Sequence, residues 1–280
     1  FVTSPCFDLS VYDVFGVLGA GGTVVVAVEE ALADPEKLSN LIVEANITIW
    51  DSAPAALQRL VPFFQASRGE DLRLCMLSGD WIPLSLPGAI KAAFPEARVM
   101  SLGGATEAAI WSNWFPVKEV QERWASIPYG KPIQNARYHV LDRRLKPVPV
   151  GVSGDLYIGG VCLADGYLGK KKLTAERFIK DPFREEENGR LYKTGDLARY
   201  QEDGNLEFLG RADFQRKVRG FRVEMGEVEA VISQLPGVQV AICEVFPDKS
   251  GQNSLVAYVV TQESVILEED QLKSHVAQKL

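Results

Sequence analysis

The amino-acid sequence predicts an α/β protein with a large parallel-sheet body, a β-rich lobe, and a small α/β C-terminal subdomain that follows a hinge. Apolar strands and helices alternate as far as Leu102, which favours a parallel sheet. After Gly130 the expected strands become short and are separated by Gly, Pro and Asp turns. A chain of 280 residues is also too long for one small core.

The α/β body is expected over residues 1–129. Asp34 and Pro35 predict the start of a helix, since Asp is a favoured N-cap and Pro a favoured first helical residue. Further helices are expected over Pro54–Phe64 and Gly88–Phe94. The expected strands are Thr23–Ala27, Ile47–Trp50, Leu72–Leu77 and Val99–Leu102.

The β-rich lobe is expected over residues 130–212, and the small subdomain over residues 213–280. A short helix is predicted in the lobe over Leu173–Phe178. The lobe strands are expected at Arg137–Leu141, Asp155–Ile158, Arg190–Tyr192 and Leu206–Leu209. In the subdomain we expect a hairpin around Gly220, a helix over Gly226–Leu235, strands over Val238–Phe246 and Ser254–Val260, and a helix from Glu268.

The overall composition excludes several kinds of protein. The net charge of −7 argues against a nucleic-acid partner. The 4 cysteines lie far apart without metal-ligand spacing, so we expect buried thiols in a reducing compartment. Because no apolar run reaches membrane-span length and no signal peptide opens the chain, we expect a cytoplasmic protein.

Three short segments carry candidate chemistry. The Gly-rich run Ser101–Glu107 follows a strand, and its Thr106 and Glu107 suit a phosphate oxygen and Mg²⁺; a plain loop has the same pattern. Asp196 follows a glycine, where a carboxylate can accept bonds from two ribose hydroxyls or from local backbone amides. Asp8, in an apolar setting, needs either a cation or a role as an N-cap.

The segment Gly210–Glu229, G-R-A-D-F-Q-R-K-V-R-G-F-R-V-E-M-G-E-V-E, resembles the hinge motif of adenylate-forming enzymes, and most of all that of nonribosomal peptide synthetase adenylation domains. The resemblance places the hinge at Asp213 and puts Lys217 on the face that rotates toward the active site. Ser101–Glu107 and Tyr192–Leu197 are similar to two further core motifs of that family. In the first motif Gly103 and Ala105 replace the family's Tyr and Pro, of which the Tyr lies against adenine.

The resemblance implies a role for each matching residue. Thr106 and Glu107 would be catalytic, with Glu107 also holding Mg²⁺. The nucleotide would contact Gly103, Gly104, Ala105, Asp196, Phe208 and Arg211. Asp8 would bind the substrate's α-ammonium group, which makes the substrate an α-amino acid. The substrate pocket would consist of Asp8, Leu9, Tyr12, Asp51, Met76, Ser78, Leu102 and Ile110.

This pocket resembles those of cysteine-activating domains, which usually have Asn in place of Asp51. Because an ionised carboxylate only accepts hydrogen bonds, and a hydroxyl donates better than a thiol, serine or a substituted serine competes with cysteine. The implied reaction uses MgATP to form aminoacyl-AMP and then loads the phosphopantetheine thiol of a carrier protein. The alternatives are an acyl- or aryl-CoA ligase and a non-catalytic docking scaffold. Since the family's phosphate loop and C-terminal lysine are not found in these 280 residues, we expect no adenylation by the chain alone.

Overall fold

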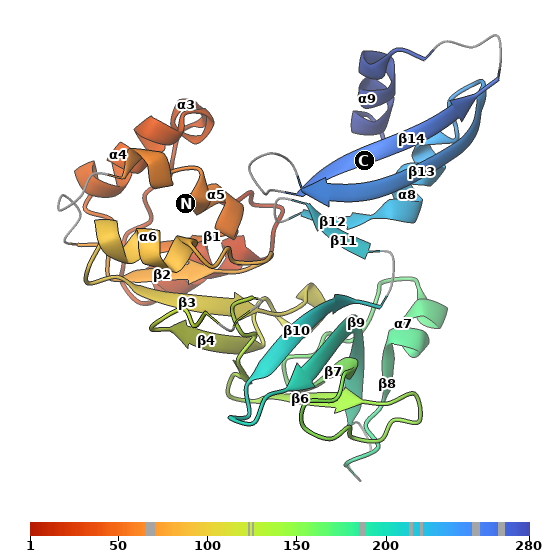
Figure 1. Ribbon diagram of the computed structural model, residues 1–280, viewed down its shortest axis with the longest axis horizontal. Helices are drawn as coiled ribbons and strands as arrows, with labels where there is room; N and C mark the ends of the chain where they lie inside the picture. The colour runs from red at the N-terminus through yellow and green to blue at the C-terminus, as the bar shows by residue number, and fades with distance from the viewer. Residues whose placement is uncertain are drawn as a thin grey trace. The chain divides into compact units, whose positions relative to one another are not determined.

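A computed structural model describes residues 1–64, 71–122, 124, 126–184, 189–212, 215–218, 221–247, 253–262 and 267–280 of the chain. The chain divides into two compact units, Phe1–Ala212 and Asp213–Leu280. Helices and sheets are mixed in both, so the predicted α/β class is confirmed (Figure 1). Among the helices of the described residues, none combines the length and apolar character needed to cross a membrane.

The first unit is built on a five-stranded sheet with the order β1-β2-β3-β4-β5. The strands β1 (Ile49–Ser52), β2 (Leu74–Leu77) and β3 (Arg98–Gly103) are parallel, as the alternation of strands and helices predicts. The strands β4 (Asn113–Val117) and β5 (Lys131–Pro132) join antiparallel and were not predicted. Pro116 and Pro132 make these two segments unlike strands in the sequence, because proline lacks the backbone N–H that the hydrogen bonds between strands need.

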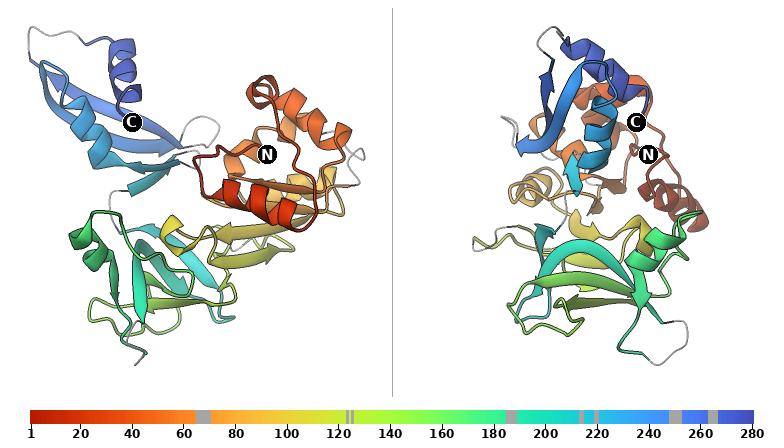
Figure 2. Two further views of the ribbon diagram at one scale, coloured as in Figure 1. Left: turned by 180° about the vertical axis from the view of Figure 1, so that it is seen from behind. Right: turned by 90° about the vertical axis from the view of Figure 1, so that its right-hand side faces the viewer.

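Apolar residues on one face of this sheet pack against the helices α4 (Pro35–Glu44), α5 (Pro54–Gln58) and α6 (Leu86–Ala93) (Figure 1). The register sets Trp50 beside Cys75 and Cys75 beside Val99, and all three are buried in this core. Since side chains alternate across a strand, the intervening residues face the other way. That opposite face bears the helical segment Leu9–Gly19, drawn in red in Figure 2.

Two predicted elements of the body are wrong. The helix expected over Pro54–Phe64 ends at Gln58 and continues as a separate 3₁₀ turn, Val61–Phe63. Pro62 explains the break, because its ring would clash with the carbonyl four residues earlier. Thr23–Ala27 forms no strand. Among the described residues, the backbone of Val25 and Ala27 hydrogen-bonds only with that of Phe1, and these two bonds are too few to form a ladder between strands.

The β-rich lobe is an antiparallel sheet with the order β10-β9-β7-β6, and β8 pairs with β9. Its strands are longer than the sequence predicts, because β9 continues through a glycine that was interpreted as a turn. Their bounds are Ala136–Leu141 (β6), Gly154–Gly160 (β7), Phe178–Lys180 (β8), Arg190–Tyr200 (β9) and Leu206–Arg211 (β10), and the helix α7 spans Lys171–Arg177. Tyr138, Leu156, Ile158 and Leu206 lie in its buried core.

The second unit begins with the hairpin β11 (Gln215–Val218) and β12 (Phe221–Glu224), which leads into α8 (Met225–Ile232). Two long antiparallel strands follow, β13 (Val238–Pro247) and β14 (Asn253–Thr261), and then α9 (Glu269–Ala277). Cys243 of β13 is buried with Met225, Val228 and Ile232 of the α8 segment. Alternate residues of the strands, such as Ile242 and Tyr258, are exposed.

The N-cap of α4 allows a stability test within the first unit. Asp34 accepts hydrogen bonds from the backbone N–H groups of Glu36 and Lys37 at 3.0 and 3.3 Å. Asp34→Ala should therefore lower the free energy of unfolding by about 1 kcal/mol. Urea titration followed by tryptophan fluorescence reports on this unit, because all 5 tryptophans lie in it.

Ser85 supplies the matched control for this prediction. It occupies the N-cap position of α6, but its side chain makes no capping hydrogen bond. Ser85→Ala should therefore leave the urea midpoint close to that of the unchanged chain. Equal losses from the two substitutions would show that the Asp34 bonds do not stabilise α4.

Candidate functional site

The Gly-rich motif and the Asp8 segment meet in the structure, although they lie far apart in the sequence. Thr106 begins a short 3₁₀ turn, Thr106–Ala108, just beyond the end of β3. Its hydroxyl donates a hydrogen bond to Oδ2 of Asp8 at 2.6 Å. Asp8 precedes the helix at Leu9–Val11 but makes no side-chain capping bond. The N-cap interpretation of Asp8 therefore does not account for its carboxylate.

Glu107 accepts a hydrogen bond from a tyrosine hydroxyl. Its side chain is buried, with 7% of the residue exposed, and Oε1 accepts a hydrogen bond from the Tyr167 hydroxyl at 2.6 Å. Tyr192 shares this network, and burial, reinforced by the Glu107 charge, raises the pKa of Tyr192. Thr174 of α7 fixes Tyr167 by accepting its backbone N–H at 2.9 Å. No role for Tyr167 was predicted from the sequence, because nothing in the adjacent residues Gly166 and Tyr167 indicates a distant partner.

Asp196 and Arg211 form a partly buried ion pair across the β9–β10 hairpin. The guanidinium Nη1 lies 3.0 Å from Oδ1 of Asp196, with the side chains 12% and 16% exposed. Gly195, at φ +83°, lies at a bulge in β9, and the N–H of Asp196 donates to the Thr194 hydroxyl. The bulge redirects Asp196, so this motif lies within a strand and not at the predicted turn.

The backbone of Gly104 is crowded where the chain doubles back after the 3₁₀ turn. A Cβ on Gly104 would lie 2.5 Å from the carbonyl oxygen of Ile110, so no side chain fits there. Ala109 and Ile110 adopt φ values of +58° and +65°. These values are strained for residues with a Cβ, and most of all for a β-branched one. The loop therefore holds Ile110 in an unusual backbone conformation.

The expected substrate-pocket residues gather on the sheet face opposite the helix-covered core. Strand alternation sets Asp51 beside Met76 on this face. Leu102 of β3 has the same parity as Met76's partner Met100, and Ser78 follows directly after the end of β2. The Leu9–Gly19 segment supplies buried Leu9 and also Tyr12. The Tyr12 ring lies 5.0 Å from that of Trp111, whose indole N–H donates to the Ser78 hydroxyl at 3.0 Å.

Asp51 is the most unusual group among the expected substrate-pocket residues. Only 6% of the residue is exposed, and neither carboxyl oxygen has a hydrogen-bond partner in the described part of the chain. Burial, reinforced by the neighbouring Asp13 carboxylate, raises the pKa of Asp51 to about 8. Burial also raises the pKa of Asp13. This raised pKa makes the protonated carboxyl of Asp51 accessible near neutral pH, and that form can donate as well as accept, which the ionised carboxylate assumed above cannot.

The donor set suits Mg²⁺ bound together with phosphate, but not a closed protein cage. Within the described ranges there is no group of three or more His, Cys, Asp or Glu side chains that could hold a metal ion. Mg²⁺ commonly uses one or two carboxylates plus substrate phosphates and waters. Glu107 supplies one carboxylate and directly follows Thr106, whose hydroxyl suits a phosphate oxygen, so it fits that pattern. Asp213, the expected hinge residue, lies outside the described residues, and Lys217 lies in β11.

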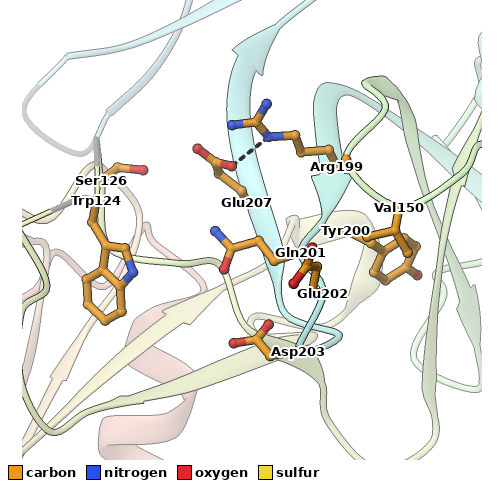
Figure 3. Close-up of a pocket in the computed structure, with 10 residues that line it drawn as sticks. Trp124, Ser126, Val150, Arg199, Tyr200, Gln201, Glu202, Asp203 and Glu207 are labelled. Carbon is orange, nitrogen blue, oxygen red and sulfur yellow. Dashed lines mark hydrogen bonds and ion pairs between the residues drawn. The ribbon is translucent and has the colours of Figure 1, made fainter.

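A separate surface hollow of about 540 Å³ lies at the turn end of the β9–β10 hairpin (Figure 3). Trp124, Arg199 and Glu207 are among its lining residues, and Arg199 pairs with Glu207 at 2.7 Å. The strand register puts Asp196 and Arg211 at the other end of the hairpin. None of the candidate site residues lines this hollow.

The fold is of the α/β class, and the candidate site residues of β1 and β3 lie toward the carboxyl ends of parallel strands, the usual place for ligands in such sheets. A family model described as AMP-binding enzyme matches residues 1–168. The chain belongs to the AMP-binding enzyme family.

The similar proteins include nonribosomal peptide synthetases. Bacitracin synthase 1 of Bacillus licheniformis is 43% identical over 265 residues, which are 94% of this chain and 5% of the relative. Pyochelin synthetase PchE of Pseudomonas aeruginosa is 46% identical over 247 residues, which are 87% of this chain and 17% of the relative. The chain thus spans a small part of these relatives.

Solved structures share the fold. The crystal structure of IdnL1 matches with a TM-score of 0.84 and 30% identity, over 100% of this chain and 57% of that one. The nonribosomal peptide synthetase FmoA3 in its α-methyl-L-serine-AMP bound form matches with a TM-score of 0.70 and 40% identity, over 81% of this chain and 25% of that one.

Asp51→Asn should make the free energy of unfolding less dependent on pH. The folded protein holds the Asp51 proton to about pH 8, whereas the unfolded carboxyl has the ordinary pKa of 3.8. The stabilisation is therefore complete below pH 3.8 and is lost as the pH rises toward 8. An amide does not ionise, so the free energy of unfolding of the variant should fall less between about pH 5 and 8.

Urea titrations at several pH values measure this slope, with tryptophan fluorescence as the signal. Asp165→Asn is the control, because that carboxylate is fully exposed. An unchanged slope in Asp51→Asn would show that Asp51 is ionised in the folded protein at neutral pH.

Proposed function

We propose that this chain forms part of an ATP-dependent ligase that converts an α-amino acid and MgATP into aminoacyl-AMP and pyrophosphate. The observation that carries the proposal is the hydrogen bond between Thr106 and Asp8. It brings a carboxylate suited to the substrate's ammonium group next to a hydroxyl suited to a phosphate oxygen. An amino acid and ATP bound at these two residues would be adjacent, as in-line attack on the α-phosphate requires.

The nucleotide would occupy the surface formed by the Gly-rich loop and the β9–β10 hairpin. The backbone of Gly103, Gly104 and Ala105 would approach the nucleotide closely. Asp196 would accept the ribose hydroxyls, with Arg211 orienting the carboxylate through the ion pair. Phe208 packs on Trp81, with the ring centroids 5.0 Å apart, and would offer an apolar contact.

Glu107 would hold Mg²⁺ together with the phosphate oxygens. When bound, the ion would neutralise charge on the phosphates as pyrophosphate leaves. The chain's own contribution is to fix the carboxylate before ATP arrives. Tyr167 does this through its 2.6 Å hydrogen bond, which leaves Glu107 little freedom to be lost on binding.

The substrate side chain would be small and able to hydrogen-bond. Asp51 and Ser78 would be polar groups that the pocket offers to it, and Met76, Leu102 and Ile110 would supply its apolar lining. FmoA3, at 40% identity, was crystallised with α-methyl-L-serine-AMP, which supports a serine-type substrate for this chain. A neutral Asp51 can donate to a sulfur as an Asn does, so cysteine remains the competing substrate.

The second half-reaction would transfer the aminoacyl group to the phosphopantetheine thiol of a carrier protein. Similar structures include PA1221, described as an NRPS protein containing adenylation and PCP domains, at 25% identity and a TM-score of 0.80. Rotation about Asp213 would bring Lys217 to the active site for this step. Hinge residues need only absorb a change in φ and ψ.

Amino-acid-dependent ATP–pyrophosphate exchange tests the proposed function. The assay uses the native polypeptide that carries this sequence, with a panel of amino acids and of acids that lack an amine. We expect a signal for serine, α-methylserine or cysteine. Exchange only with acids lacking the amine would identify an acyl- or aryl-CoA ligase, and silence from folded protein would favour a docking scaffold; either result contradicts the proposal.

Asp8→Asn tests the role of the carboxylate in binding the amine. The amide oxygen can still accept the Thr106 hydroxyl, but the negative charge is lost. Because hydrogen bonds to charged groups contribute about 1.5–3 kcal/mol, the KM for the amino acid should rise about tenfold or more. The KM for ATP should change little, and Asp142→Asn, in an exposed turn, should leave both unchanged. An unaltered amino-acid KM would assign the ammonium group to another residue.

A further inference from the structure

Tyr129 occupies the space in which a side chain at position 103 would lie. A Cβ added to Gly103 would lie 2.4 Å from Cε2 of Tyr129 and 2.7 Å from its Cζ. Both distances are far shorter than any ordinary carbon–carbon contact. The backbone of Gly103 is not in the left-handed region, so an L-residue could adopt its conformation. Sterically, the ring of Tyr129 and Oδ1 of Asn113, which would lie 2.7 Å from the added Cβ, together explain why position 103 has no side chain.

Tyr129 is fixed in this place from several sides. Its backbone N–H donates to the carbonyl of Leu206 at 2.8 Å, and its carbonyl accepts from the Asn113 amide. Its hydroxyl has a backbone hydrogen bond with Gly104, and burial raises its pKa well above the usual value. The side chain is densely surrounded and yet keeps part of its surface exposed. Such a ring is already oriented before a ligand arrives.

Tyr129 belongs to a row of aromatic rings that ends in solvent. Its ring stacks on Phe208 with centroids 5.8 Å apart at 29°, and Phe208 contacts Trp81 at 5.0 Å. Trp81 is 47% exposed. The Asp196–Arg211 pair lies close enough to act electrostatically on Tyr129. Flat apolar surface beside an ion pair suits a ligand with an aromatic ring attached to a polar sugar.

We infer that Tyr129, together with Phe208, supplies the aromatic surface against which the nucleobase of ATP lies, in place of a side chain at position 103. The inference rests on the proposed function and extends it. It assigns base recognition to the connection between β4 and β5, which the sequence motifs did not indicate. Gly103 contributes to this surface because it has no side chain, which leaves room for the Tyr129 ring to lie over its backbone.

The test compares variants of Tyr129 in the native polypeptide by pyrophosphate exchange. Tyr129→Leu keeps apolar bulk over Gly103 but removes the aromatic face. Its KM for ATP should rise about fivefold to 100-fold, the range expected for losing a stacked base. Tyr129→Phe should stay near the unchanged protein. The double variant Tyr129→Ala with Gly103→Tyr should recover part of the affinity, because a ring can then enter the same space from the other side.

Three readouts separate base recognition from general damage. The KM for the amino acid and the inhibition constant of pyrophosphate, which has no base, should not change in Tyr129→Leu. Phe183→Ala is the matched control, because it removes another aromatic stack of the same lobe, on His139 at 4.7 Å. Its ATP KM should be normal.

Two results would overturn the inference while wild-type exchange is intact. One is an unchanged ATP KM in Tyr129→Leu, and the other is an equal loss for ATP, amino acid and pyrophosphate. A wild-type protein without exchange would instead remove the proposed function itself. Should Tyr129→Leu fail to fold, Tyr129→Phe and the double variant decide instead. The inference expects a normal ATP KM in Tyr129→Phe and a lower ATP KM in the double variant than in Gly103→Tyr alone. A double variant that binds ATP no better than Gly103→Tyr alone contradicts the inference.

Discussion

The hydrogen bond between Thr106 and Asp8 is the contact on which the geometry of the candidate site depends. It ties the end of β3 to the start of the Leu9–Gly19 segment, two places 98 residues apart in the sequence. That segment lies on the sheet face bearing Asp51 and Met76. The same bond therefore sets the distance between the substrate pocket and the Gly-rich loop.

The rest of the site is arranged by packing that leaves little freedom. Glu107 is buried against tyrosine hydroxyls, and Asp196 is redirected by a bulge at Gly195 toward Arg211. Tyr129 fills the space over Gly103, and the carbonyl of Ile110 crowds Gly104. These groups are positioned by contacts within Phe1–Ala212, a unit with its own buried core. Such preorganisation would lower the entropic cost of binding the two proposed substrates at once.

Much of the fold follows from local signals in the sequence. The capped helix at Asp34, the parallel strands and the β-rich lobe were predictable because propensity, periodicity and turn chemistry agree there. Three of the misses share a cause, since β4, β5 and the break at Pro62 involve prolines whose effect depends on their neighbours in space. Thr23–Ala27 has the composition of a strand but lacks a long enough partner.

The candidate site was predictable only where a motif signals chemistry. Thr106, Glu107, Asp196 and Asp8 stand in such motifs, but their partners do not. Tyr167 and Tyr129 are ordinary aromatic residues in the sequence, and only the tertiary structure brings them to Glu107 and Gly103. The raised pKa of Asp51 likewise depends on burial and on Asp13, which a linear pattern does not report.

The left-handed backbone at Ile110 has a consequence for how the pocket can evolve. An L-residue in this conformation costs about 1–2 kcal/mol relative to glycine, and a β-branched side chain is among the least suited. Replacing Ile110 by a smaller residue tolerant of this φ would relieve the backbone strain and, under its proposed role in the substrate pocket, would also enlarge that pocket. Under that proposal, a substitution at position 110 that admits larger substrates would need no stabilising mutation elsewhere, which makes it an accessible starting point for a change of substrate.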